Sequence, residues 1–260
     1  MKESNLKKSN NTFVDAWVMF KRCFIISLRN PETLLTATLI PFSLMLLFGT
    51  VFGSISDVGD FNYIDFIVPG IILQSIGQAS QYSAMNVTVD MTKGIIDRFR
   101  CMSISKSAVL IGHTGAGVIR GIISNAVIII TAFILGFRPQ AGLMDWILVI
   151  LLLLLINITV TLIAVLCGII SKSVEGSSGL LFPLFILPFI SSGFAPVDTL
   201  PGGIRWFAAI QPMTPIIDSL RSLTLDLPLG NSLVLALGWC LVLSIVSFTV
   251  SMWTYNRKLS

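Results

Sequence analysis

Long uncharged apolar runs constrain what this chain can fold into more than any other feature of its sequence. Residues 33–56, 66–89 and 227–256 contain no Asp, Glu, Lys or Arg. A helix that crosses the hydrocarbon core of a bilayer needs about 20 such residues. Only 12% of the 260 residues are charged, against roughly 25% in soluble domains. We therefore predict an all-α membrane protein in which no separate soluble catalytic domain has room.

Six transmembrane helices follow when the remaining runs are added. The expected spans cover residues 33–56, 66–89, 107–137, about 145–171, 176–197 and a segment within 227–256. Lys and Arg gather in the tail, in the loops at 90–106 and 172–175, and at the C-terminus, whereas the opposite side has only Arg138, Arg205 and Arg221. Because positive charge collects in cytoplasmic loops, we expect both termini to be cytoplasmic and the protein to lie in the cell membrane.

The residues before the first span divide into two parts. Residues 1–12 are polar and rich in Lys, and we expect them to form a disordered cytoplasmic tail. Residues 13–30 have apolar side chains at helical spacing and charged ones on the other face, which predicts an amphipathic helix in the membrane interface. Its apolar residues are Phe13, Trp17, Phe20, Phe24 and Leu28. Residues 31–260 then form the six-span domain.

An apolar connection separates the last two expected spans. It is too long for an ordinary loop, and prolines divide it into two short amphipathic segments, residues 204–210 and 216–223. Backbone can dip into a membrane where protein surrounds it. We expect a short re-entrant or interfacial helical hairpin at the outer end of the domain.

Polar residues inside the expected spans are candidates for a translocation route. Gln74, Gln78 and Gln81 share one face of the second span, Asn86 follows them, and Arg120 lies inside the third. A central arginine costs on the order of 2.5–3.5 kcal/mol on insertion scales. These side chains either form interhelical hydrogen bonds or line a polar path, and the residues alone leave both interpretations open.

Signatures of catalysis are missing from the sequence. The only histidine, His113, has no nucleophile or acid at a persuasive spacing, and Gly112–Gly115 is better explained as a packing stretch. The four cysteines have no metal-binding spacing, and no basic patch with interleaved aromatics predicts nucleic-acid binding. We predict no catalytic residue and no metal site. No GxxxxGK[ST] motif occurs either, so if ATP drives this protein, another chain binds it.

One short charged segment interrupts the apolar runs, TKGIIDRFR at residues 92–100. Ile95, Ile96 and Phe99 share a face of a short helix, and Gly94 permits the turn out of the preceding span. The charged face either meets a soluble partner or lies against anionic lipid headgroups. The full candidate contact set is Thr92, Lys93, Gly94, Ile95, Ile96, Asp97, Arg98, Phe99 and Arg100.

Resemblance to a known family decides between these interpretations. KGIIDRFR followed by SxSAVLIGH resembles the cytoplasmic coupling segment of type 2 ABC transporter permeases, with the daunorubicin-resistance (multidrug) kind as the nearest subgroup. LRNPETLL, GFRP and the long FPLFILPFISSGFAPVDTLPGGIRWF stretch agree, and the resemblance extends from about residue 13 to 256. Ser103 stands where the family often has a proline, which puts the exit angle of the coupling helix in doubt.

The resemblance implies an exporter subunit. Two separate ATPase subunits would bind ATP and Mg, and this chain would bind no cofactor. A second copy of this chain, or a close relative, would complete the translocation route, and membrane lipids would surround both. The cargo would be a hydrophobic or amphipathic compound such as a drug, an antibiotic or a lipid-linked molecule. The alternatives are a secondary transporter, which needs carboxylates at helix centres, and a membrane scaffold or enzyme that transports nothing.

Overall fold

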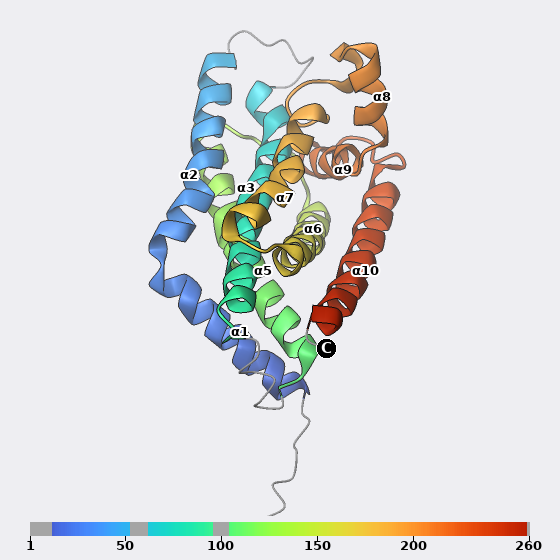
Figure 1. Cartoon of the computed structure of the whole chain (residues 1–260). Coiled ribbons are helices and arrows are strands. Elements are labelled where there is room, and N and C mark those ends of the chain that lie inside the picture. Colours follow the sequence, from blue (N-terminus) through green and yellow to red (C-terminus); the bar gives the residue numbers. More distant parts are fainter. Residues whose placement is uncertain (1–11, 53–61, 96–103, 259–260) are drawn as a thin grey trace, which may run out of the picture.

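The computed structural model describes residues 12–52, 62–95 and 104–258, and every regular element in these ranges is a helix (Figure 1). The N-terminal part of the chain forms α1 (Thr12–Arg29), α2 (Pro31–Leu47) with a π-helical extension (Phe48–Phe52), α3 (Tyr63–Thr92), α5 (Lys106–Leu135) and α6 (Leu143–Ile170). It continues with α7 (Val174–Ile186), two 3₁₀ turns (Leu187–Ile190 and Val197–Thr199), α8 (Gly202–Ile210), α9 (Met213–Leu225) and α10 (Ser232–Lys258). The prediction of an all-helical protein is confirmed.

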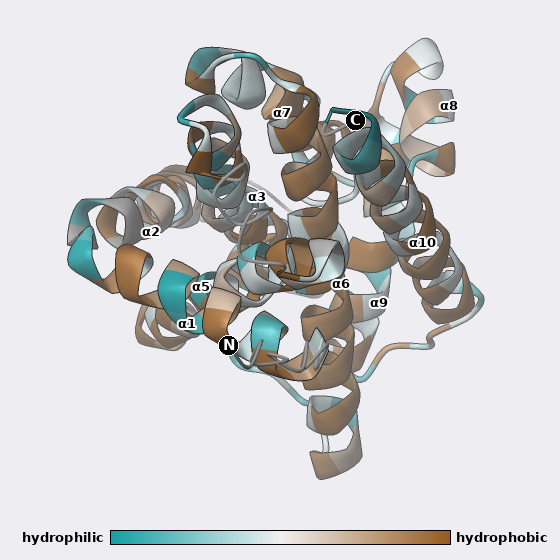
Figure 2. Cartoon of the chain, turned by 60° about the horizontal axis from the view of Figure 1, so that its bottom comes forward, coloured by the Kyte–Doolittle hydropathy of each residue, from teal (hydrophilic) through white to brown (hydrophobic). Residues whose placement is uncertain are grey.

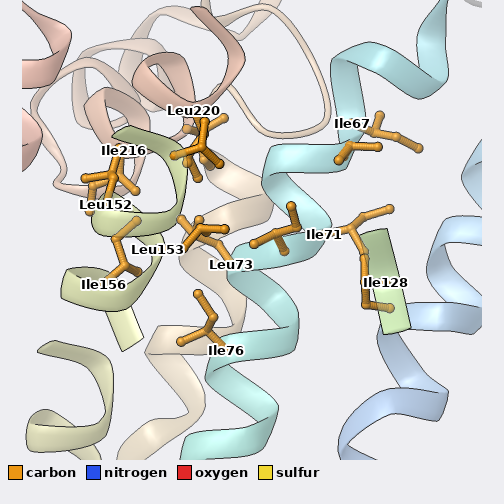
Figure 3. Packing of buried hydrophobic residues seen from close by; sticks show 14 of the residues in the cluster. Ile67, Ile71, Leu73, Ile76, Ile128, Leu152, Leu153, Ile156, Ile216 and Leu220 are labelled. Atoms are coloured by element: carbon orange, nitrogen blue, oxygen red, sulfur yellow. The ribbon is translucent and has the colours of Figure 1, made fainter. Parts of the chain in front are cut away.

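The central helix is α3, which packs against α2, α5, α6, α7 and α9. Ile67, Ile71 and Ile76 of α3 are fully buried. Figure 3 shows them among side chains from three other helices, which are Ile128 of α5, Leu152, Leu153 and Ile156 of α6, and Ile216 and Leu220 of α9. A helix buried on most of its circumference is the expected place for a long uncharged sequence.

Three helices in the described residues are long and apolar enough to cross a membrane: Ser107–Leu135, Leu143–Ile170 and Ser232–Lys258. The last of them, α10, leaves most of its apolar surface uncovered, with Val234 71% and Ile245 65% exposed. The hydropathy colouring in Figure 2 shows hydrophobic residues recurring along α10. Outward apolar side chains suit a lipid environment, so the fold is that of a membrane protein. The larger number of six spans stays a prediction.

The expected fifth span is shorter than the sequence predicts. A single helix over residues 176–197 is wrong, because α7 ends at Ile186 and gives way to a 3₁₀ turn that contains Pro188. Proline removes a backbone donor and disfavours α-helical geometry in the residue before it. The chain then turns against α3, where a Cβ on Gly70 would stand 2.8 Å from the Gly193 carbonyl oxygen.

Two short helices, α8 and α9, occupy the connection after α7, close to the segments that the sequence predicts. They differ in burial, because α8 leaves Trp206 69% exposed whereas α9 buries Ile217, Leu220 and Leu223 in the core. The Gln211 amide between them donates to the Leu187 and Ile190 carbonyls, at 3.2 and 3.0 Å. These bonds hold the connection to the end of α7. Its depth in the membrane stays a prediction.

The beginning of α1 and the end of α10 lie at the same end of the molecule (Figure 1). Lys258 Nζ donates to the Ile169 and Ile170 carbonyls at the end of α6, at 2.5 and 3.3 Å. A cation at a helix C-terminus meets unpaired carbonyls and the negative end of the helix dipole. Helix α8 lies at the opposite end.

Candidate coupling and translocation sites

The structure describes the first four residues of the candidate coupling segment, Thr92–Ile95. The Thr92 hydroxyl, at the end of α3, donates to the Thr88 carbonyl at 2.8 Å. Gly94 has φ 65°, in the left-handed region that glycine tolerates without strain. This conformation turns the chain out of α3, as the sequence predicts. The other members, Ile96, Asp97, Arg98, Phe99 and Arg100, lie outside the described residues, and so does Ser103.

An ion pair borders this segment on its N-terminal side. Arg22 of α1 donates to both carboxylate oxygens of Asp90 in α3, at 2.6 and 2.9 Å. His113 Nε2 of α5 lies 3.1 Å from Asp90 Oδ2. Bidentate guanidinium–carboxylate pairs are among the strong and directional hydrogen bonds. The bond to Asp90 raises the pKa of the Arg22 guanidinium, so this arginine stays charged, and a single carboxylate joins α1, α3 and α5.

A second polar contact borders the segment on its C-terminal side. Asp15 Oδ2 of α1 accepts the backbone N–H of Ser105, the residue before α5, at 3.0 Å. A carboxylate at a helix N-terminus satisfies an otherwise unpaired donor and meets the positive end of the helix dipole. Helix α1 is therefore bonded to a residue just before the candidate coupling segment and to one just after it. We call Asp15, Arg22, Asp90, Ser105 and His113 the α1 clamp.

Close backbone packing holds α1 in this position. A Cβ on Gly112 of α5 would stand 2.7 Å from Met19 Cβ, and one on Gly115 would stand 2.9 Å from the Phe20 ring. The two glycines thus let α1 cross α5 in direct contact. This geometry shows that Gly112 and Gly115 serve helix packing, as the sequence predicts.

The face of α1 that packs on the protein is a row of small and medium side chains, namely Ala16, Met19, Cys23 and Ser27. The predicted interfacial residues are elsewhere on the helix. Phe13 (80%), Trp17 (60%) and Leu28 (55%) are exposed, whereas Phe20 and Phe24 are partly buried and stack on each other with ring centroids 5.8 Å apart. The aromatic face is thus free to lie among lipid headgroups, and its role there stays a prediction.

Arg120 is buried between three helices with only 3% of its surface exposed. Its guanidinium donates to Ser27 Oγ of α1 at 2.5 Å, to the Ala79 carbonyl of α3 at 3.0 Å and to Ser83 Oγ of α3 at 3.3 Å. Its Nε finds no partner among the described residues. These bonds give the arginine a structural role, and they hold it against the side of α3 that carries Ala79 and Ser83.

The predicted polar face of α3 is covered unevenly. Gln74 is buried, 4% exposed, with an unpaired Oε1 among the described residues. Gln78, Gln81 and Asn86 are partly exposed. Helices α2 and α7 pack against α3. They nevertheless leave these three amides partly exposed.

Two charged residues at the opposite end join α3 to the connections around it. Arg221 of α9 donates to the Phe66 carbonyl at 3.0 Å and to the Ser192 carbonyl, and its guanidinium lies 3.8 Å from the Phe66 ring centroid. Asp65 accepts the Arg138 backbone N–H at 3.0 Å. In the sequence, Arg138 and Arg221 count only as positive charges on the outer side, and their contacts to α3 are not predicted.

The clamp residues Arg22, Asp90 and His113 were also missed as a group. A carboxylate one residue beyond an uncharged run is a usable signal in the sequence, and so is a lone histidine near the start of the next helix. Their pairing is not readable, because 23 residues separate them. Among the described residues, no three His, Cys, Asp or Glu side chains gather as they would around a metal ion.

Comparison with known proteins adds evidence that does not depend on this geometry. The family model described as ABC-2 type transporter matches residues 15–225. A daunorubicin resistance ABC transporter permease protein, DrrB1 of Streptomyces coeruleorubidus, is 27% identical over 74% of this chain and 69% of its own. The inner membrane transport permease YadH of Escherichia coli is 28% identical over 93% and 96%. A probable doxorubicin resistance ABC transporter permease protein, DrrC of Mycobacterium tuberculosis, is 24% identical over 81% and 77%.

Proposed function

Because the chain belongs to the ABC-2 type transporter family, we propose that it is the membrane-spanning subunit of an ATP-driven exporter. Membership makes it a permease that works with a separate ABC ATPase subunit. Two similar permeases are named for resistance to daunorubicin and doxorubicin. The cargo that we propose is accordingly a hydrophobic or amphipathic compound, moved out of the cytoplasm.

The assembly that we propose contains two permeases and two ATPases in the cell membrane. Each permease has six spans and both termini in the cytoplasm, and ATP and Mg bind to the ATPases. The excess of Lys and Arg around the termini and the 90–106 loop supports this orientation. So does the position of the α1 start and the α10 end at one end of the molecule.

The observation that carries the proposal is the pair of contacts from α1 to both borders of the candidate coupling segment. In our proposal the ATPase presses on residues 92–100 when it binds ATP. The Arg22–Asp90 pair and the Asp15–Ser105 bond then pass the displacement to α1, α3 and α5. A bistable membrane domain would shift between inward and outward arrangements under such a bias.

The route that we propose follows the polar face of α3. Three partly exposed amides, Gln78, Gln81 and Asn86, would face hydrocarbon unfavourably if lipid covered them. A second permease copy that packs beside α2 and α7 would instead enclose them in a protein-lined path. Gln74 Oε1, which has no partner among the described residues, adds a hydrogen-bonding group to that face, and the unpaired Nε of Arg120 lies on the α5 side of α3.

The test is co-expression with the partner ABC ATPase subunit, with Asp97 and Arg98 both changed to Ala. We expect loss of ATPase co-purification and of daunorubicin efflux. A matched control removes the exposed Asp198–Arg205 pair at the opposite end, which also deletes one acid and one base. Undiminished ATPase association in the first variant would contradict the coupling assignment.

A further inference from the structure

A pocket of about 340 Å³ lies between α5 and α6. This volume falls within the usual range for small-molecule sites, roughly 300–1,000 Å³. Its outer residues are the exposed side chains of Ile122, Ile150 and Leu154. Both helices are among those long and apolar enough to span the membrane. A molecule dissolved in the bilayer can therefore reach this pocket without passing through water.

The inner part of the pocket is lined by two amides, Asn125 of α5 and Asn157 of α6, which are 4% and 1% exposed. Asn157 Nδ2 donates to the Leu153 carbonyl at 2.9 Å within its own helix. The Oδ1 atoms of both asparagines find no hydrogen-bond partner among the described residues. A Cβ on Gly121 would stand 1.9 Å from Asn157 Oδ1, so this amide lies directly against α5.

Unpaired amide oxygens cost free energy inside a membrane protein. Buried polar groups in proteins nearly always have hydrogen-bond partners, and hydrocarbon offers none. An asparagine side chain has an acceptor oxygen and an N–H₂ donor. The group that satisfies it best both accepts and donates, as a hydroxyl does. The remaining lining is apolar, which suits a hydrocarbon body.

We propose that this pocket binds an amphiphile from the bilayer that has an apolar body and a hydroxyl group, with Asn125 as the main hydrogen-bonding residue and Asn157 beside it. The proposal goes beyond the export function and does not depend on it, because it needs only that α5 and α6 lie in the membrane. The hydroxyl accepts from the Asn125 amide nitrogen and donates to an amide oxygen. Binding would require the Asn125 side chain to rotate so that this buried oxygen reaches the pocket.

Photolabelling of the purified complex in lipid nanodiscs tests the site. The probe is dodecanol with a diazirine on its chain, and the comparison probe is dodecane with the same diazirine. Hydrogen bonds in membranes are worth roughly 0.6–1.7 kcal/mol, which corresponds to a roughly three- to eighteenfold change in affinity. We expect dodecanol to label α5 and α6 peptides that much more strongly in the natural protein than in N125L, and dodecane to label both equally.

Two further variants keep the result interpretable. Thr249 is an exposed residue of α10 whose hydroxyl bonds to its own helix, so T249V should leave dodecanol labelling of α5 and α6 unchanged. Ala126 is an exposed residue of the pocket wall. A126F should block the pocket and abolish labelling while Asn125 remains, which covers the case in which N125L does not fold.

Equal dodecanol labelling of the natural protein and N125L would overturn the proposal, and so would equally strong labelling of the natural protein by dodecane. Competition with daunorubicin tells whether the hydroxyl compound that binds in this pocket is an exported compound or a membrane lipid. Displacement of the label assigns the pocket to exported compounds, and unchanged labelling assigns it to a lipid alcohol. Both of these outcomes support a hydroxyl-binding site.

Discussion

The Arg22–Asp90 pair gives a quantitative test of the α1 clamp. Asp90 accepts both Arg22 bonds and lies within reach of His113. Changing Asp90 to Ala leaves a guanidinium and an imidazole at the junction of three helices without their acceptor. We expect the variant to lose stability and, in the assembled exporter, to hydrolyse ATP without moving a corresponding amount of compound.

The burial of the two side chains determines the size of the coupling energy between Arg22 and Asp90. Breaking a fully buried ion pair costs about 3–5 kcal/mol, whereas pairs exposed to solvent contribute about 0.2–1 kcal/mol. The Asp90 side chain is 7% exposed and that of Arg22 is 27% exposed, so this pair falls between the two classes. We expect a coupling energy of about 1–3 kcal/mol.

A double-mutant cycle measures this energy. The free energies of unfolding of the natural protein, R22A, D90A and R22A/D90A are compared by titration with a denaturing detergent. The Asp198–Arg205 pair is the matched control, because its side chains are 83% and 53% exposed and its coupling energy should stay at about 0–1 kcal/mol. If the losses in R22A and D90A simply add in the double variant, the pair does not join α1 to α3 energetically, and the reasoning fails.

Three other perturbations test neighbouring features. Gly112→Leu should destabilise the protein by about 1–3 kcal/mol through overpacking against Met19, whereas Gly203→Leu, where a Cβ meets nothing within 4 Å, should change thermal unfolding little. Arg120→Met should retain folding but reduce substrate-stimulated ATP hydrolysis if the arginine serves the route, and unchanged stimulation would leave it a purely structural residue. Arg221→Lys loses the forked contacts to the Phe66 and Ser192 carbonyls and should cost about 1–2 kcal/mol in a detergent unfolding titration.

Hydrophobicity predicted which segments are helices but not which faces meet protein. The sequence predicts that Phe13, Trp17 and Leu28 lie in the membrane interface, and the structure leaves all three exposed, but their spacing does not tell which side of α1 packs on protein. The protein-facing side is the row through Ala16 and Met19. Lipid tails are as apolar as side chains, so packing in membranes depends on small residues and close approach. The paired glycines of α5 were therefore a better guide to the contact than the aromatic spacing.

The break in α7 and the polar contacts were harder to predict for a different reason. Pro188 is a visible signal in the sequence, yet proline is tolerated inside membrane helices when neighbours satisfy the freed backbone groups. Here Gln211, from a later segment, donates to two carbonyls of the 3₁₀ turn that follows α7. The Asp90–His113 and Arg221–Phe66 contacts likewise depend on how helices meet in space. Such pairings need the fold before they can be seen.

The clamp also has a mechanical consequence. A segment whose borders are unattached can absorb a push by letting them spread apart. Here the Asp15 and Arg22 side chains, which project from one stiff helix, fix the spacing between Ser105 and Asp90. In the exporter that we propose, helix α1 would act as a brace between the two borders of the segment, and a load applied there would rotate α1, α3 and α5 together. If the aromatic face of α1 lies among the headgroups, as we propose, it would move through that layer in each transport cycle, and lipid composition should change the transport rate.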